Sequence, residues 1–431
     1  MKSILQKYSS TSLIIRIVIG LIIGACLGIL VPGASAIGIL GTLFVGALKA
    51  IAPILVFILI IASLARANTG MGKQFGTVIG LYVFNTFAAA ALAVFMSYAF
   101  PTTITLADAA KDQAAPSGIV EVLTTLLNNL VANPVEALAN ANYLGILMWA
   151  VIFGLTLKIT ATDHLKESLG NLSDAIAQAV RWVINLAPFG ICGLVFSAVS
   201  ENGIEIFVDY GKLILLLVGT MLAMAFVVMP LIVFAATHKN PYPLVVKCLR
   251  DSGITAFFTR SSAANIPVNM SLCEELGLNR DFYSVSIPLG ATINMNGAAI
   301  TITILSMVAC NTLGITVDVP SAIILSLLAT VSACGASGVA GGSLLLIPMA
   351  CSLFGISSDI SMQIVGVGFI IGVIQDSCET AINSSGDAIF AAAAEFRHWR
   401  KEGKEVDMSW KALNKNRKTK GDAHTDEAEA A

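Results

Sequence analysis

Long apolar segments with few charged residues follow one another along this chain from about Leu13 to about Ala394. Over the full 431 residues 56% are apolar and 12% are charged, whereas an average soluble domain is about 45–50% apolar and about 25% charged. So little polar material cannot coat a water-soluble globule. The sequence therefore excludes a cytosolic enzyme, argues against a single-span receptor, and predicts a polytopic membrane protein.

The positive charges predict how the chain is oriented in the membrane. Nine of the 25 Lys and Arg residues lie between Arg397 and Lys420, and most others cluster near residues 2–16, 66–73, 158–166 and 239–250. The connections between these clusters carry mostly Asp and Glu. By the positive-inside rule both termini are expected in the cytoplasm, with an even number of spans between them. The net charge of −2 indicates no nucleic-acid partner.

Cysteine and histidine give no sign of a metal centre. The eight cysteines never form a CxxC pair and most lie in apolar runs, so we interpret them as small hydrophobic residues. The four histidines fall in predicted loops or in the tail. No transition metal and no organic cofactor are expected.

Apolar runs that can cross about 30 Å of hydrocarbon are predicted at 13–31, 37–65, 77–100, 142–157, 176–200 and 211–236. In the first run Gly20, Gly24 and Gly28 share one helix face, which suits close packing between membrane helices. Ordinary membrane-helix composition explains the same pattern.

The pattern changes after residue 239. Segments 251–276 and 322–354 each have two arms too short to span a membrane, separated by a tip around Arg260 and a glycine-rich tip at 332–343. Irregular backbone is tolerated at membrane depth only where it is buried or lines a cavity. An apolar helix with polar residues in its middle follows each segment, so the pattern predicts two re-entrant hairpins in inverted repeats, with a binding site between them. Irregular loops in a channel are the alternative.

The last apolar helix carries a polar stripe, because Asp376, Thr380, Asn383 and Asp387 share one face and Glu379 lies at its edge. Acids in a membrane span are costly unless they face a cavity or a partner. Three carboxylates without a basic residue in that span predict a bound cation or amine. The alternative is that this row of polar residues has a purely structural role.

The preceding helix contains Asn294 and Asn296, which cannot face one site from a regular helix. Flanked by Gly290 and Gly297, this segment is expected to unwind and free its carbonyls. Carbonyl and carboxylate oxygens suit hard cations, so a sodium site with Asn383 and Asp387 is predicted. A kink in a packed helix is the alternative.

Two further features suggest an amino acid as the ligand. Ser261 and Ser262 at the first tip, with backbone amides, are suited to a carboxylate, and Asp376 is suited to an ammonium. A ligand that carries both groups is an α-amino acid.

Three long stretches, Phe258–Asn269, Asn294–Ala299 and Gln375–Ser385, resemble the dicarboxylate/amino acid:cation symporter family, which includes glutamate transporters. The similarity covers nearly the whole chain and is closest to bacterial serine/threonine:sodium symporters. It implies an all-α polytopic membrane protein with eight transmembrane helices, two re-entrant hairpins, inverted repeats, an elevator-type transport domain and a homotrimer. The implied location is the bacterial cytoplasmic (inner) membrane.

The resemblance also implies a division of the chain into domains. Residues 1–12 form a cytoplasmic N-terminus, 13–240 mainly scaffold and trimerisation helices, 241–396 the transport core, and 397–431 a cytoplasmic tail. Spans three and six are expected to join the transport core.

The resemblance assigns roles residue by residue. The implied substrate site is Ser261, Ser262, Val339, Asp376, Glu379, Thr380 and Asn383. Sodium would be held by Gly290, Thr292, Asn294, Ala333, Cys334, Ala336, Asn383 and Asp387. A third sodium site would involve Tyr82, Asn85, Thr86 and Asn296, but Asn296 replaces an acid of the family pattern, so coupling to three sodium ions is not expected.

Glu379 stands where dicarboxylate carriers have an arginine, and a like charge disfavours a second substrate carboxylate. Two interpretations of Glu379 stay open: it is protonated, or it pairs with Arg260. Lys49, inside an apolar run, is expected to snorkel to the membrane surface.

The leading hypothesis is a sodium-coupled symporter that imports serine and threonine and is not an enzyme. The main alternative is an acidic amino acid or dicarboxylate symporter coupled to sodium or protons. An intramembrane aspartyl protease is disfavoured because Asp376 and Asp387 share one helix, whereas a catalytic dyad needs close approach. A passive channel is the remaining competitor.

Overall fold

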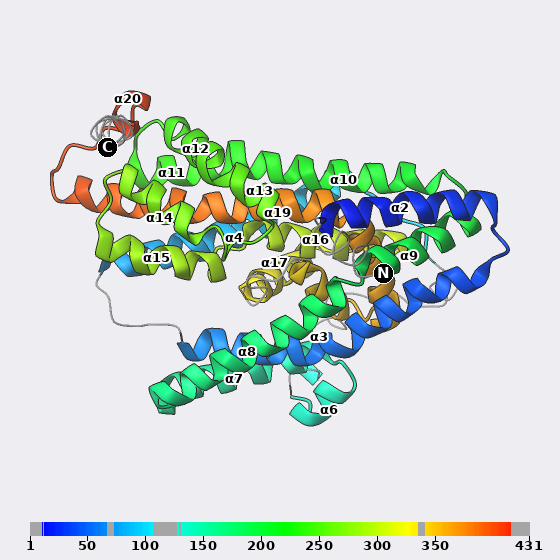
Figure 1. The fold of residues 1–431 in the computed structure, drawn as a ribbon. Coiled ribbons are helices and arrows are strands. Elements are labelled where there is room, and N and C mark those ends of the chain that lie inside the picture. Colours follow the sequence, from blue (N-terminus) through cyan, green and yellow to red (C-terminus); the bar gives the residue numbers. More distant parts are fainter. Residues whose placement is uncertain are drawn as a thin grey trace, which may run out of the picture.

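The computed structural model describes residues 11, 13–66, 73–106, 127–128, 131–334 and 341–414. This described part is a bundle of helices that contains no β-strand (Figure 1). Its first half comprises α2 (Leu13–Leu30), η1 (Ser35–Ile37), α3 (Gly38–Arg66), α4 (Lys73–Ala99), α6 (Pro134–Ala139), α7 (Tyr143–Thr160), α8 (Asp163–Ile184), α9 (Ala187–Asn202), α10 (Ile206–Ala223), η3 (Met224–Val228) and α11 (Met229–Thr237).

The second half of the chain consists of shorter helices followed by one very long one. Its elements are α12 (Tyr242–Cys248), η4 (Leu249–Gly253), α13 (Ile254–Thr259), α14 (Ile266–Glu275), α15 (Arg280–Ile293), α16 (Asn296–Thr312), α17 (Val319–Ala333), η5 (Gly342–Leu346), α18 (Ile347–Ser352), α19 (Ser358–Lys401) and α20 (Trp410–Leu413). The described fold is therefore helical throughout, as the sequence predicts.

Within the described residues six helices are long and apolar enough to cross a membrane, and one bent pair raises this number to seven. They are Ser35–Arg66, Phe75–Ala99, Tyr143–Thr160, Ile206–Thr237, Arg280–Thr312 and Ser358–Lys401, with Asp163–Ile184 and Ala187–Glu201 as the pair. The polytopic membrane character is thus confirmed. Helix α2 ranks among the shorter apolar helices, and the count of eight spans stays a prediction.

The prediction of one continuous span at 176–200 is wrong. The chain bends by 50° between α8 and α9. Pro188 lies in the first turn of α9, where its missing N–H costs nothing, but it cannot donate to a preceding helical turn. Helix α8 therefore ends at Ile184, and α9 begins in a new direction.

The glycine face of α2 packs directly on α9. A Cβ added at Gly20 would lie 2.1 Å from the Pro188 carbonyl oxygen, and one at Gly24 would lie 2.4 Å from that of Cys192. The opposite face of α2 exposes large apolar side chains, among them Ile19 and Ile22. The stripe of small residues is therefore a helix-packing surface.

We expect Gly24→Ala to weaken the contact between α2 and α9, because its methyl group meets backbone that cannot yield without moving a helix. Overpacking of this kind costs about 1–3 kcal/mol. The measurement is the thermal unfolding midpoint of the purified protein in detergent. Gly46→Ala on α3 is the matched control, since its added Cβ meets nothing within 4 Å. Equal midpoints for the two variants would contradict the packing role.

The two segments predicted as hairpins are built from short helices. In the first, α13 ends at Thr259, Arg260 adopts a left-handed backbone conformation with φ 52°, and α14 begins at Ile266. In the second, α17 ends at Ala333 and η5 begins at Gly342. Half of the predicted second tip, residues 335–340 with Ala336 and Val339 among them, lies outside the described residues. The helices α12, η4 and α13 follow one another without a break, so the arm before Arg260 is the end of a helical run that begins at Tyr242. The helix breaks at the two tips are observed, and a re-entrant path in a membrane stays a prediction.

Helix α19 runs through the middle of the second half of the bundle (Figure 1). Helices from both halves of the chain pack against it: α4, α10 and α11 from the first half, and α13, α14, α15, α16 and α18 from the second. At its start Asp359 forms an ion pair with Lys49 of α3. The lysine expected to snorkel thus ties α3 to α19.

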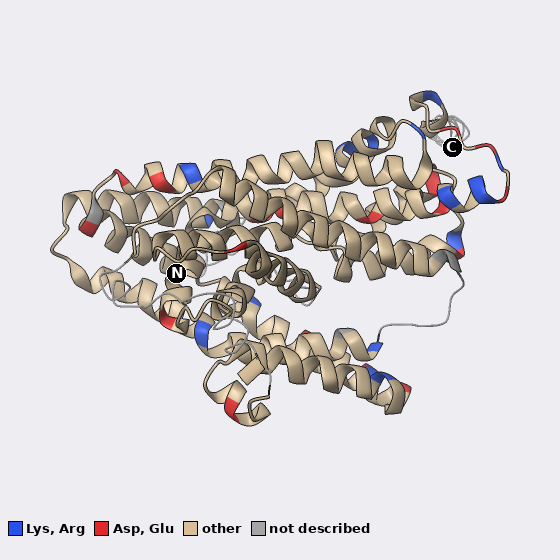
Figure 2. Ribbon diagram, turned by 180° about the vertical axis from the view of Figure 1, so that it is seen from behind, with Lys and Arg blue, Asp and Glu red and all other residues tan. Residues whose placement is uncertain are grey.

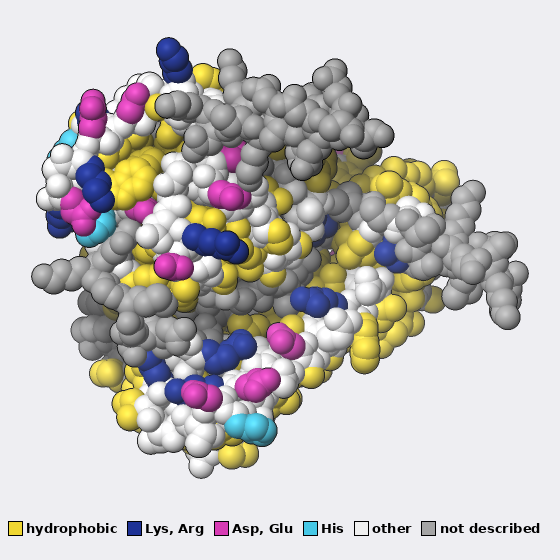
Figure 3. Space-filling model, turned by 60° about the vertical axis from the view of Figure 1, so that its left-hand side comes forward, with side chains coloured by type: hydrophobic (Ala, Val, Ile, Leu, Met, Phe, Trp, Pro, Cys, Tyr) yellow, Lys and Arg dark blue, Asp and Glu magenta, His cyan; other side chains and the backbone are white. Residues whose placement is uncertain are grey.

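Most charged residues lie toward the ends of the bundle, whereas acidic residues of α19 are buried within it. Figure 2 shows Lys and Arg concentrated at the end that holds α12, α20 and the end of α19. Figure 3 shows the same end from outside, with charged side chains on its surface and a mainly hydrophobic flank beside it. Large exposed side chains on the flanks include Leu215 of α10 and Leu231 of α11. This distribution is typical of a protein whose flanks face lipid.

Candidate functional site

The helix break predicted at Asn294 is present and faces the polar stripe of α19. Helix α15 ends at Ile293, α16 begins at Asn296, and both residues between them have non-helical dihedral angles. The Asn294 amide donates hydrogen bonds to Asp387 Oδ1 at 3.0 Å and to the Asn383 carbonyl at 3.1 Å. The predicted meeting of Asn294, Asn383 and Asp387 is therefore observed.

Asp387 is 1% exposed, and its second carboxylate oxygen, Oδ2, has no hydrogen-bond partner among the described residues. A buried carboxylate is strongly unfavourable unless a counter-charge or several donors compensate it. The carboxylate oxygen, the helix-break carbonyls and the neighbouring amides are the donor set that a hard cation prefers.

Glycine at position 290 allows the α15 backbone to approach this carboxylate. A Cβ there would lie 2.9 Å from both Asp387 Oδ1 and the Tyr82 hydroxyl. Tyr82 is fully buried, and its hydroxyl is within hydrogen-bond distance of the backbone carbonyls of Asp387 at 3.0 Å and Ser286 at 3.2 Å. Helix α4 is therefore fastened to α15 and α19 beside the candidate cation position.

The residues predicted for a third sodium site are only partly brought together. Asn85 donates to Asn294 Oδ1 at 2.8 Å, and the Thr86 hydroxyl lies 3.4 Å from the Ile293 carbonyl. The side chain of Asn296 instead accepts a hydrogen bond from the Gly297 N–H at 2.8 Å. The α4 residues thus join the Asn294 and Asp387 cluster rather than Asn296.

The end of α17 lies next to the helix break. The Cys334 thiol is 3.4 Å from the Ile293 carbonyl, and Ala333 is fully buried. The Thr292 hydroxyl donates to the Leu289 carbonyl at 2.7 Å, which leaves its oxygen available as an acceptor. This places Thr292, Ala333 and Cys334 in one region, as expected for a second cation position.

The other end of the stripe holds an ion pair. Arg260, at the tip between α13 and α14, places Nε and one terminal nitrogen each 2.6 Å from Asp376 Oδ2. The backbone N–H of Gly341 lies 3.5 Å from the other oxygen, Oδ1. Both charged side chains are almost completely buried. The interpretation that Arg260 pairs with Glu379 is therefore wrong.

Glu379 has a separate set of partners from three elements. Its Oε2 accepts hydrogen bonds from Thr301 of α16 at 2.7 Å, from Ser343 of η5 at 2.8 Å, and from the Gln375 amide one turn earlier in α19. Three hydrogen-bond donors thus converge on one oxygen of this buried acid. Sequence reasoning missed Thr301, Ser343 and Gln375, although Gln375 stands four positions before Glu379, on the same helix face.

The remaining predicted ligand residues are held by local contacts. Ser261 accepts a hydrogen bond from the Ala264 N–H at 3.2 Å, and Thr380 donates to the Asp376 carbonyl at 2.7 Å. Asn383 Oδ1 accepts from the Gly297 N–H at 2.7 Å, and Ser262 is buried. Thr380 and Asn383 lie between Asp376 and Asp387 on α19, and Ser261 and Ser262 follow Arg260 at the first tip.

A small cavity lies beside the Arg260 and Asp376 pair. Its polar residues are Arg260, Gln375 and Asp376, and its other lining residues are Ile17, Ile184, Ala187, Gly341, Leu344, Phe369, Gly372 and Val373. The space open to a water-sized molecule is only about 10 Å³. The cavity is therefore too small for an amino acid, and a larger ligand requires its walls to separate.

Comparison with known proteins agrees with this geometry. The profile of the sodium:dicarboxylate symporter family matches residues 13–395. A serine/threonine transporter SstT of Bifidobacterium adolescentis is 59% identical, over 94% of each chain. Proteins of the same name from Streptococcus agalactiae and Streptococcus thermophilus are 63% and 58% identical, over 92% and 93% of this chain and 98% and 100% of theirs. With a helix break opposite buried acids and a family match over most of its length, the chain belongs to the sodium:dicarboxylate symporter family.

Proposed function

We propose that this chain is a secondary symporter that carries serine and threonine into the cell together with sodium. The observation that carries the proposal is the buried Asp387 carboxylate, whose Oδ2 has no partner among the described residues at the break between α15 and α16. Sodium bound there restores the missing counter-charge. The names of the similar transporters support the choice of serine and threonine as substrates.

For the coupling ions we propose two positions. The first uses Gly290, Asn294, Asn383 and Asp387, and the second uses Thr292 with the hairpin residues Ala333, Cys334 and Ala336. The first is supported by the contacts between Asn294 and Asp387, and the second by the approach of Cys334 to Ile293. The third position, with Tyr82, Asn85, Thr86 and Asn296, is not part of the proposal, because Asn296 is uncharged and turned to Gly297.

For the substrate we propose that Asp376 binds the ammonium group. Ser261, Ser262, Thr380, Asn383 and the backbone of Val339 would surround the carboxylate and the rest of the ligand. Arg260 now neutralises Asp376, so an arriving ammonium must replace the guanidinium at Oδ2. This exchange keeps the buried acid paired both with and without substrate, which avoids the cost of an isolated buried charge.

The charges near the cavity favour neutral substrates over dicarboxylates. Arg260 is the single cation among the described lining residues, and it is paired with Asp376. Glu379 is a second acid at the same end of the stripe, and it accepts hydrogen bonds from Thr301 and Ser343. A second substrate carboxylate close to Glu379 would meet a like charge. The separate partners of Asp376 and Asp387 also fit two binding positions better than one catalytic dyad.

We further propose eight transmembrane helices, two re-entrant hairpins in inverted repeats, and a homotrimer with both termini in the cytoplasm of a bacterial cell. The transport core, 241–396 with spans three and six, would move as an elevator against the scaffold. The packing of α4 and α10 on α19 supports their inclusion in the core. The gathering of Lys and Arg at the end that holds α20 supports the orientation (Figure 2).

The proposal predicts uphill uptake of labelled serine into proteoliposomes when sodium is high outside. A proton gradient of equal size, without sodium, is expected to drive no accumulation. Unlabelled threonine should compete with serine, whereas unlabelled aspartate should not. Uptake that follows the proton gradient, or competition by aspartate as strong as that by threonine, would favour the acidic amino acid symporter. Equilibration without accumulation would indicate a channel.

A further inference from the structure

Gln375 lines the cavity but is not among the residues proposed to bind substrate or sodium. It is 1% exposed and immediately precedes Asp376 on α19. Its amide nitrogen lies 2.8 Å from the Thr301 hydroxyl and also donates to Glu379 Oε2. Both hydrogens of the amide nitrogen are therefore used by these two neighbours.

These contacts determine which way the amide points. In the structure the side-chain nitrogen of Gln375 faces both Thr301 and Glu379, which turns its oxygen away from them. Thr301 donates to Glu379 at 2.7 Å and accepts from Gln375, which closes a ring of three side chains. Ser343 holds the same Glu379 oxygen from η5 at 2.8 Å. Glu379 thus acts on Gln375 as a positioning residue.

The amide oxygen of Gln375 is left without a partner. Oε1 is completely buried and makes no hydrogen bond with the described residues. Gln375 lines the cavity together with Arg260 and Asp376. A buried carbonyl without a donor is rare in folded proteins and unfavourable, so a donor supplied by a ligand would complete this arrangement.

The groups of a hydroxy amino acid can be assigned by their chemistry. The ligand carboxylate has no proton to give to Gln375 Oε1, and the ammonium is attracted to the charged Asp376. The side-chain hydroxyl is the remaining donor. We infer that Gln375 Oε1 accepts a hydrogen bond from the hydroxyl of serine or threonine, and that Glu379 determines this specificity by holding the amide in place. This inference rests on the proposed function.

The test compares substrates that differ only in the hydroxyl group. Wild-type protein in proteoliposomes, under a sodium gradient, is expected to prefer serine over alanine, and threonine over the isosteric valine, by about 10-fold or more in apparent affinity. Gln375→Met keeps the side-chain length and removes the acceptor. It is expected to lower the affinity for serine and threonine by about 10-fold and to leave alanine and valine within about 3-fold.

Glu379→Gln tests the positioning role. A neutral amide at 379 both donates and accepts hydrogen bonds, so it no longer dictates the orientation of the Gln375 amide. The ratio of the apparent affinities for serine and alanine is therefore expected to fall. Thr303→Val is the matched control, because Thr303 is also buried with an unpartnered oxygen but does not line the cavity. Its ratios should equal those of the wild type.

The outcomes separate this inference from the function on which it rests. If the wild type fails to accumulate serine with sodium, the proposed function fails. If the wild type does so and Gln375→Met leaves both ratios unchanged, or weakens all four substrates equally, the inference alone is overturned. If Gln375→Met does not fold, as judged by size-exclusion chromatography, Gln375→Asn replaces it as the test. Its side chain is one methylene shorter, so its carbonyl cannot reach as far, and the affinity ratios of serine to alanine and of threonine to valine must fall.

Discussion

Replacing Asp387 by asparagine is expected to abolish sodium-driven accumulation of serine, with sodium affinity lowered by about 100-fold or more. The substitution keeps an oxygen that can accept from Asn294 but removes the negative charge. Leaving one partner of a buried charge pair uncompensated costs about 3–5 kcal/mol, and every 1.4 kcal/mol is about 10-fold in affinity. Among the described residues, Asp387 is the acid at this position that the bound cation would lose.

Two readouts distinguish lost ion binding from lost folding. Uptake of labelled serine under a sodium gradient measures transport, and the rise of the thermal midpoint with added sodium measures binding to the folded protein. Both should be lost in Asp387→Asn. Glu395→Gln is the matched control, because Glu395 lies on the same helix and is equally buried, at 1% exposed. Sodium dependence that survives in Asp387→Asn would remove the proposed sodium position.

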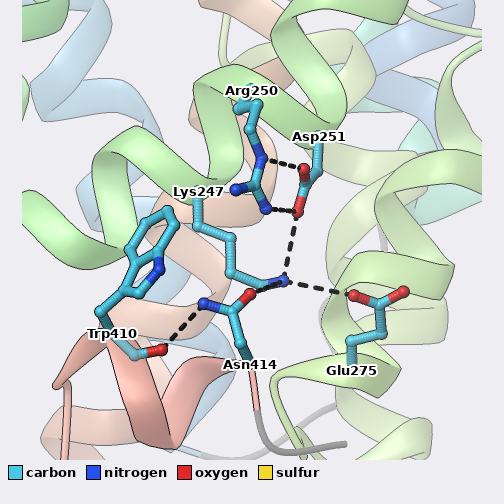
Figure 4. Close-up of polar contacts among 6 residues, drawn as sticks. All are labelled: Lys247, Arg250, Asp251, Glu275, Trp410 and Asn414. Atoms are coloured by element: carbon cyan, nitrogen blue, oxygen red, sulfur yellow. Dashed lines mark hydrogen bonds and ion pairs between the residues drawn. The ribbon is translucent and has the colours of Figure 1, made fainter. Parts of the chain in front are cut away.

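The largest expected effect on stability concerns Lys247, whose side chain is completely buried. In space it lies beside Asn414, the last of the described residues. Its ammonium group lies 3.2 Å from Asp251, 3.3 Å from Glu275 and 3.2 Å from the amide oxygen of Asn414 (Figure 4). These partners come from η4, the end of α14, and the residue after α20. One lysine thus joins both arms of the first hairpin to the C-terminal segment.

Neighbouring contacts reinforce the same junction. Arg250 holds Asp251 through two nitrogens, at 2.6 Å and 2.9 Å, and its guanidinium lies 5.1 Å from the centre of the Trp410 ring (Figure 4). The segment that returns from α19 also buries Val406 and Met408. Residues 404–414, here called the strap, therefore pack across the end of the first hairpin that lies away from its tip at Arg260.

We expect Lys247→Met to destabilise the folded protein by up to about 3 kcal/mol, because the partly buried Asp251 and Glu275 would keep their charges with less compensation. Denaturant titration in mixed micelles measures this change. Asn414→Ala alone should cost less, and a double-mutant cycle with Lys247→Met isolates the contribution of the strap. Lys212→Met is the control, since Lys212 forms an exposed pair with Asp209 and should change stability by less than about 1 kcal/mol. Equal effects of the two lysine variants would contradict the assigned role of Lys247.

The same cluster predicts how stability depends on pH at its acidic limit. Burial raises the pKa of Asp251, but the hydrogen bonds from Arg250 and Lys247 more than offset this, so the pKa lies below its ordinary value. A lowered pKa in the folded state stabilises the protein above the ordinary pKa, and this contribution is lost as the pH falls through the lowered value. Its loss should therefore appear only at pH values below about 4.

Several features of the site could be predicted from the sequence because they depend on local periodicity. The spacing of Asp376, Asn383 and Asp387 fixes their common helix face, and asparagines between two glycines indicate the break at Asn294. The helix break at Arg260 follows from the polar tip between two short apolar runs. The exception among the spans is 176–200, where Pro188 starts a new helix after a bend of 50°.

The choice of partners was decided only by the tertiary structure. Asp376 and Glu379 are one helical turn apart, and the sequence offers no reason why Arg260 should select one of them. The structure places Arg260 beside Asp376 and surrounds Glu379 with the donors Thr301, Ser343 and Gln375.

The sequence by itself thus determined the membrane class, the helices, the break and the stripe of acids, because these depend on residues within a few turns of one another. Arg260 and Asp376 are 116 positions apart, Thr301 and Glu379 are 78 apart, and Lys247 and Asn414 are 167 apart. Such pairs form only when separate helices pack in one register, so only the tertiary structure decided which buried charge is neutralised and which acceptor stays open to a ligand.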